Sequence, residues 1–154
     1  MKSNVFSLMF IHVVFTPKFR RSLLREEIQE EVFRYISGII TQKGHKSIIV
    51  NGMPDHVHIL TGFKPITSIS DLVRDIKRSS ALFINEKNLV PVKFQWQEGY
   101  GAFSCGYKDL DAVYNYIKNQ KVHHQKASFR TEYVALLEEN EIDYKTDHLF
   151  QFFE

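Results

Sequence analysis

The order of apolar patterns along the chain is the strongest constraint on its fold. Residues 5–15 and two runs within 45–63 are rich in Val, Ile and Phe, as expected of buried strands, and residues 92–106 alternate apolar with polar positions. Residues 23–42 and 67–88 place apolar side chains three and four apart, which is typical of amphipathic helices. The order strand, helix, strand, strand, helix, strand predicts an α+β fold of the ferredoxin-like, split βαβ type, with an antiparallel sheet and helices on one face.

Finer features of these elements can also be predicted. The two runs within 45–63 are separated by "NGMPD", which indicates a connection longer than a tight two-residue turn. Ser70 is a plausible N-cap of the second helix, and Leu82 belongs to that helix's predicted buried stripe. Two more helical segments follow, at 110–125 and 128–140. The length of the chain is suited to a single domain spanning residues 1–154.

Cysteine content and apolar run lengths bear on the compartment. The chain of 154 residues has one cysteine, Cys105, so it can form no internal disulfide and no Cys-rich zinc site. The apolar run at 5–15 contains His12 and continues into "TPKFRR" without a small-residue cleavage site, which favours a strand over a signal peptide. No run reaches the roughly 18 apolar residues that a membrane helix requires. We therefore expect a cytoplasmic protein that does not enter a membrane.

Two histidines stand one residue apart in "MPDHVHIL". On a strand, His56 and His58 point to the same face while Val57 points to the other. Two neutral imidazoles on one face can share a divalent metal ion. Taken alone, the pair is more simply explained as surface or hydrogen-bonded strand histidines of no further function. Strand alternation predicts that Asp55 faces away from the pair, which leaves it out of the expected ligand set.

A second group of candidates lies in "LDAVYNYIKNQKVHH". Tyr116 and Gln120 are four apart and therefore share one helix face. Each also has an ordinary interpretation, as a half-exposed tyrosine and a surface glutamine. Tyr114 and Lys118 form a rival pair at the same spacing, but Tyr114 falls on the apolar stripe of this helix and is most simply a core aromatic.

The chain resembles the single-tyrosine HUH transposases of small insertion sequences over nearly its entire length. Four blocks carry the resemblance and occur in the family's order: "FTPKFRR", "MPDHVHIL", "QWQEGYGAFS" and "YIKNQKVHH". The resemblance implies that His56, His58 and Gln120 bind one divalent ion, Mg²⁺ or Mn²⁺. It also implies that Tyr116, on a C-terminal helix, is the nucleophile that cleaves and rejoins single-stranded DNA through a 5′-phosphotyrosine. The expected partners are DNA hairpins at the element's ends and a second copy of the chain, in a homodimer whose tyrosine helices complete each other's sites.

Basic residues supply weaker evidence for DNA binding, because the net charge is only +2 and basic helix faces are often merely solvated. The candidate phosphate contacts are Lys18, Arg20, Arg21, Arg74, Lys77, Arg78 and Lys121. Two alternatives stay open: a domesticated HUH nickase that acts on repeated palindromes, and a non-catalytic module that binds single-stranded nucleic acid. A plasmid-transfer nickase is disfavoured by Gln120 and by the short chain.

Overall fold

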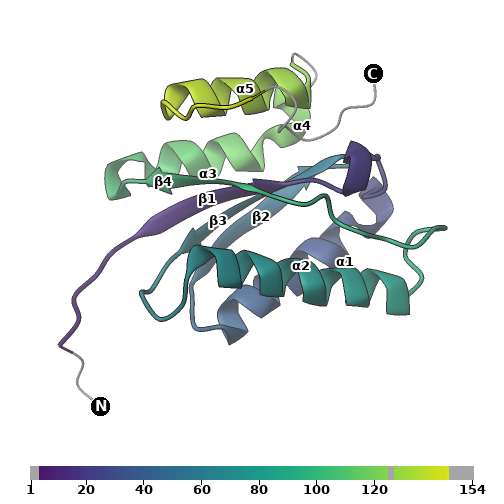
Figure 1. The fold of residues 1–154 in the computed structure, drawn as a ribbon, viewed down its shortest axis with the longest axis horizontal. Helices are drawn as coiled ribbons and strands as arrows, with labels where there is room; N and C mark the ends of the chain where they lie inside the picture. Colours follow the sequence, from purple (N-terminus) through teal and green to yellow (C-terminus); the bar gives the residue numbers. More distant parts are fainter. Residues whose placement is uncertain (1–3, 125–126, 146–154) are drawn as a thin grey trace.

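The computed structural model describes residues 4–124 and 127–145, and its centre is a four-stranded antiparallel sheet with the strand order β2-β3-β1-β4 (Figure 1). The strands and the first two helices are β1 Phe10–Phe15, α1 Glu26–Gln42, β2 Ser47–Met53, β3 His56–Gly62, α2 Ile69–Glu86 and β4 Gly101–Cys105. Their sequence order and the sheet order confirm the α+β class and the ferredoxin-like, split βαβ topology.

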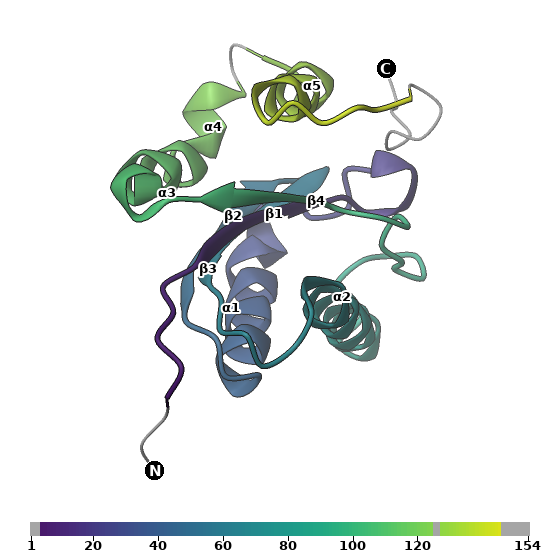
Figure 2. The ribbon, with the colours of Figure 1, turned by 60° about the vertical axis from the view of Figure 1, so that its left-hand side comes forward.

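Helices cover both faces of this sheet (Figure 2). The pair α1 and α2 packs on one face, as the predicted fold requires. The other face carries the C-terminal helices α3 Leu110–Lys118, α4 Gln120–His123 and α5 Phe129–Glu139. Short 3₁₀ helices, η1 Lys18–Arg20 and η2 Tyr107–Asp109, precede α1 and α3.

Strand β1 shows how the two layers divide the side chains. Ile11, Val13 and Phe15 belong to the large core shared with α1 and α2, whereas Val14 packs with Phe103 and α5 on the opposite face. Because both faces are covered, the strand is apolar throughout except for the buried His12. The face that carries His12 is also the face on which the tyrosine helix lies.

The connection between β2 and β3 corrects a prediction. The strands are joined by a turn of only two residues, Pro54 and Asp55, with Met53 paired to His56. The expectation of a longer connection was wrong because β2 continues through the first three residues of "NGMPD", to Met53. Gly52 allows the close approach, since a Cβ atom there would collide with the carbonyl oxygen of His56.

Helix α2 differs from the prediction in its cap and in one buried position. Ser68 is the N-cap and accepts a hydrogen bond from the backbone N–H of Asp71 at 3.0 Å, so the assignment to Ser70 was wrong. Ser70 instead shares a hydrogen bond of 2.7 Å with the Tyr100 hydroxyl. Leu82 was also misassigned, because 56% of its surface is exposed.

Three other predicted elements are shorter than expected. The first strand begins at Phe10, and the preceding Phe6 is 94% exposed. The last strand begins only at Gly101, after Gly99 adopts a φ of +92°. The helix predicted at 110–125 breaks at Asn119 into α3 and α4, and position 125 lies outside the described residues. In the part of the chain that is described, no helix combines the length and apolarity needed to cross a membrane.

Candidate metal and tyrosine site

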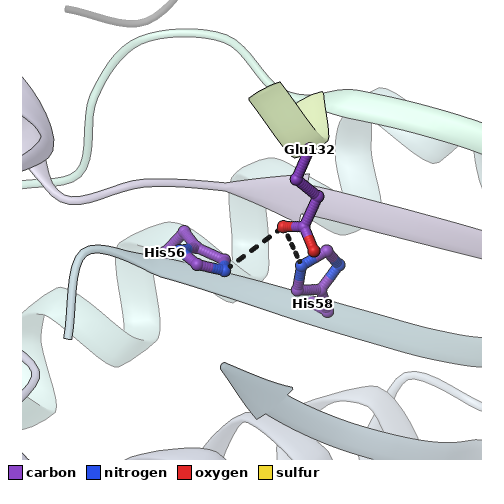
Figure 3. A group of neighbouring side chains, drawn as sticks. All are labelled: His56, His58 and Glu132. Carbon is purple, nitrogen blue, oxygen red and sulfur yellow. Dashed lines mark hydrogen bonds and ion pairs between the residues drawn. The ribbon is translucent and has the colours of Figure 1, made fainter. Parts of the chain in front are cut away.

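The histidine pair lies on β3, beneath α4 and α5. Both imidazoles are fully buried, and they share one face of the sheet, as residues two apart on a strand must. In Figure 3 both rings turn one nitrogen toward the same carboxylate, that of Glu132 on α5. The distances from Glu132 Oε1 are 3.1 Å to His58 Nε2 and 3.5 Å to His56 Nε2.

The other two predicted residues reach this pair from the same chain. Gln120, the first residue of α4, places its Oε1 atom 3.0 Å from His56 Nε2 and is fully buried. The ring of Tyr116, near the end of α3, stands edge-on to His58 with centroids 5.7 Å apart. Asn51 on β2 holds the end of α3 in place, because its amide donates to the carbonyl oxygen of Ile117 at 2.9 Å. The structure therefore brings His56, His58, Tyr116 and Gln120 together. Tyr114 and Tyr116 both pack against the Leu60 and Ile117 cluster, and Tyr116 is the one whose ring adjoins His58.

Glu132 is the residue that the sequence interpretation missed. Its Oε2 atom accepts hydrogen bonds from the Tyr116 hydroxyl and, at 3.2 Å, from the Gln120 amide. Two more imidazoles surround it, with Nε2 atoms of His123 and His124 at 3.3 and 3.2 Å. One signal for it existed: Glu132 falls on the buried face of α5 with Phe129, Tyr133 and Leu137, where an unpaired acid would be costly.

The donor set is suited to a divalent ion. One ligand atom each from His56, His58 and Glu132 lie within 4.8 Å of one another, and Gln120 Oε1 adjoins them. Two imidazole nitrogens, a carboxylate oxygen and an amide oxygen match Mn²⁺ and similar ions, while Mg²⁺ prefers an all-oxygen shell. The carboxylate adds the negative charge that the two neutral imidazoles and the amide lack.

Each histidine has a separate partner on its second ring nitrogen. His56 Nδ1 lies 2.7 Å from Asp55 Oδ1, and the other oxygen of this carboxylate lies 3.5 Å from Arg20 Nε. The expectation that Asp55 faces away was wrong, because Asp55 belongs to the turn, where strand alternation does not apply. His58 Nδ1 lies 2.8 Å from Nε2 of His12 on β1. Such partners fix the orientation of a metal-binding imidazole.

Burial and charge set the protonation states. Burial lowers the pKa of His58 to about 4 and that of His12 to about 3. Burial alone would raise the pKa of Glu132, but hydrogen bonds from His124 and His58 outweigh it and lower this pKa far below its usual range. Burial, followed by the adjacent Glu132 charge, raises the pKa of Tyr116 well above 10. At neutral pH the site therefore holds a phenol, a carboxylate and neutral imidazoles on His12 and His58.

The predicted DNA contacts fall in different places. Lys18, Arg74, Lys77 and Arg78 line a cleft of about 680 Å³ beside α2, together with Trp96 and Tyr100 among others. The Lys77 ammonium donates to the carbonyl oxygens of Gln97 and Gly99, so it also fixes the wall of this cleft. Arg20 lies at the histidine site through Asp55, Arg21 is exposed after η1, and Lys121 forms an ion pair with Glu26.

Comparison with known proteins places the chain in a family. The family model described as "Transposase IS200 like" matches residues 5–120. The transposase for insertion sequence element IS200 of Salmonella typhimurium is 28% identical over 115 residues, covering 71% of this chain and 74% of that protein. The ISDra2 transposase TnpA of Deinococcus radiodurans is 33% identical over 70 residues, or 46% of this chain and 50% of that one.

Two solved structures share the fold. A putative transposase from Deinococcus radiodurans has a TM-score of 0.61 at 23% identity, covering 78% of this chain and 96% of that one. A REP-associated tyrosine transposase bound to a REP hairpin has a TM-score of 0.60 at 14% identity, covering 100% and 98%. The family match includes both histidines, Tyr116 and Gln120, and ends before Glu132. Because it spans most of the sequence, this chain belongs to the IS200-like transposase family.

Proposed function

We propose that this protein cleaves and rejoins single-stranded DNA at the ends of an insertion sequence, with Tyr116 as the nucleophile and a divalent ion held by His56, His58 and Gln120. The observation that carries the proposal is the convergence of these four side chains on one buried spot between β3 and α4. A binding module without catalysis would not require a tyrosine hydroxyl beside a set of metal-ligand types.

The reaction follows from the chemistry of the tyrosine. The Tyr116 oxygen attacks the phosphorus of a phosphodiester, the bond to the 3′-oxygen breaks, and a 5′-phosphotyrosine forms. The covalent intermediate keeps the energy of the broken bond. The 3′-hydroxyl of another strand can therefore attack the phosphotyrosine, rejoin the DNA and release Tyr116 without ATP.

Glu132 is included in the proposal in two roles. Its Oε2 atom accepts a hydrogen bond from Tyr116 and is placed to take the phenolic proton as the new O–P bond forms. Its Oε1 atom faces His56 and His58, where it would serve as a further ligand. A divalent ion bound there, Mn²⁺ or Mg²⁺, would polarise the phosphate and stabilise the leaving 3′-oxygen.

DNA hairpins are the proposed partner. One structural neighbour is bound to a REP hairpin, and the cleft beside α2 combines basic side chains with aromatic ones, as sites for nucleic acid do. We infer that this chain binds single-stranded DNA that folds into hairpins at the element's ends.

Covalent trapping tests the function. The protein is incubated with Mn²⁺ or Mg²⁺ and labelled single-stranded DNA that carries the element's end hairpin, and the products are separated under denaturing conditions. We expect a protein–DNA adduct from the wild type and from the matched control Tyr114→Phe, and none from Tyr116→Phe. If the wild type binds the DNA and forms no adduct, the proposed function is wrong. If only Tyr114→Phe fails, the nucleophile is misassigned.

The proposal also includes a homodimer. Tyr116 and Gln120 contact the histidine site of their own chain, which supports a site that each subunit completes by itself, in place of the exchanged tyrosine helices that the family resemblance implies. Mixing the inactive variants Tyr116→Phe and His56→Ala tests this, because subunits that exchanged tyrosine helices would regenerate one intact site. We expect a dimer by sedimentation and no recovery of adduct formation in the mixture. Recovery would show that the sites are shared.

A further inference from the structure

His12 is a buried polar residue that the proposed chemistry does not use. It lies on β1 opposite Leu60, while His58 on β3 lies opposite Val14, so the two histidines are diagonal neighbours on one face of the sheet. Their rings stack with centroids 5.0 Å apart and an angle of 24° between the planes. His12 Nε2 lies 2.8 Å from His58 Nδ1, and only 4% of the His12 surface is exposed.

The two ring nitrogens of His58 decide which histidine would donate in this hydrogen bond. His58 Nε2 faces the Glu132 carboxylate, at the centre of the donor set. A metal ion bound to Nε2 uses the lone pair of that nitrogen, so the single proton of the neutral ring must be on Nδ1. The two nitrogens are 2.8 Å apart, close enough for a hydrogen bond with one shared proton; with an ion on Nε2, His58 Nδ1–H would donate to the lone pair on His12 Nε2.

We propose that His12 is a positioning residue for the metal site: it accepts the Nδ1–H of His58 and holds that ring with Nε2 toward Glu132. The inference rests on the proposed metal site and extends it to β1. His12 acts through His58 and has no contact with the metal or the DNA in this role.

The surroundings explain why an imidazole suits position 12. The corresponding partner of His56 is a carboxylate, Asp55, which is compensated by Arg20 at the rim of the site. Position 12 is enclosed by the sheet, Phe103 and Tyr116, with rings 5.7 and 6.3 Å away. A second anion there would lie close to the buried Glu132 carboxylate. An imidazole offers an acceptor without adding charge.

Metal affinity and histidine NMR test the role in the full-length protein. His12→Leu removes the acceptor at similar volume, and His12→Gln restores an acceptor oxygen. We expect His12→Leu to weaken Mn²⁺ binding by about 10- to 100-fold in calorimetric titration, and His12→Gln to recover most of that loss. With Zn²⁺ and ¹⁵N-labelled histidine, the wild type should show a slowly exchanging, downfield Nδ1–H proton of His58 that is absent in His12→Leu.

Phe103→Leu serves as the packing control, because it alters a neighbour of His12 without touching the hydrogen bond. It should lower thermal stability and leave the Mn²⁺ affinity unchanged. If the wild type binds Mn²⁺ and His56→Ala does not, but His12→Leu binds like the wild type, the positioning role is overturned while the metal site stands. If the wild type does not bind Mn²⁺, the metal site of the proposed function fails and this inference fails with it.

Discussion

The Tyr116 hydroxyl donates a hydrogen bond to the Glu132 carboxylate, and the two residues, from α3 and α5, both line a cleft of about 380 Å³. The contact has two opposing effects on a nucleophile. The anion raises the pKa of the phenol and so holds its proton in place. The same anion is the nearest acceptor when that proton must leave. The balance between the two effects decides what Glu132 contributes.

Replacing Glu132 with Gln measures the balance, because it keeps the shape and removes both the charge and the proton acceptor. Loss of a positioned proton acceptor slows a reaction by about 10²- to 10⁴-fold. When the Tyr116 proton leaves during the attack, this loss outweighs the gain from a lower Tyr116 pKa. We therefore expect Glu132→Gln to slow adduct formation by about two orders of magnitude at saturating Mn²⁺. The measurement is single-turnover formation of the covalent adduct.

Glu138→Gln is the matched control, since it makes the same change at an exposed position of the same helix. It should react like the wild type. A Glu132→Gln variant that reacts as fast as the wild type, or faster, would show that the carboxylate only restrains the tyrosine.

The part of the site that could be predicted is the part that local periodicity determines. The shared face of His56 and His58 follows from strand spacing, and the order of elements determines the topology. Tyr116 and Gln120 were expected to share a face of one helix, but the break at Asn119 puts them on α3 and α4, and they meet at Glu132 instead. That the two pairs meet was an inference from the family resemblance, not from periodicity.

Glu132 and His12 could not be linked to the histidine pair in this way. Each lies on a separate element, and its distance from the histidine pair depends on how α5 and β1 pack, which no sequence spacing encodes. Asp55 was misplaced for a different reason. It lies in the two-residue turn before β3, where the alternation of a strand does not set the direction of a side chain.

The metal-free protein should lose stability as the pH falls from about 6.5 to about 4. The pKa of His12 is lowered from 6.5 to about 3 and that of His58 to about 4, mainly by burial, so the unfolded chain takes up these protons first. Each such proton makes the free energy of unfolding fall by up to about 1.4 kcal/mol per pH unit in this range. Urea denaturation in the presence of EDTA, at half-unit pH steps, measures the slope.

Two observations check the origin of that slope. His12→Gln removes one titrating group and should make the curve shallower. Below about pH 4.5 the lowered pKa of Glu132 adds a further loss, because its carboxylate is stabilised only in the folded state. A free energy of unfolding that stays constant between pH 6.5 and 4.5 would contradict burial of neutral histidines.

The cleft beside α2 should contribute to DNA affinity and not to chemistry. Lys18 and Arg78 line it, so the double variant Lys18→Ala/Arg78→Ala should bind the end hairpin more weakly. The slope of log affinity against log salt concentration should become shallower by about 0.7 to 0.9 for each phosphate that the variant no longer neutralises. Fluorescence anisotropy across a salt series measures this. Lys87→Ala, at an exposed position that follows α2, is the control and should leave the slope nearly unchanged. Wild-type affinity in the double variant would exclude the cleft as a DNA site.

Gly52 should be essential to the turn that presents His56. A methyl group at this position would collide with the His56 carbonyl oxygen, which is backbone and cannot rotate away, so β2 and β3 would have to separate locally. We expect Gly52→Ala to lower the free energy of unfolding by about 1–3 kcal/mol and to weaken Mn²⁺ binding. Gly38→Ala in α1 is the matched control: a Cβ there meets nothing within 4 Å, and an added methyl should stabilise the helix by about 0.5–1 kcal/mol. Urea denaturation measures the free energy of unfolding of both variants. Equal values for Gly52→Ala and the wild type would show that the turn accommodates the methyl group without loss of stability.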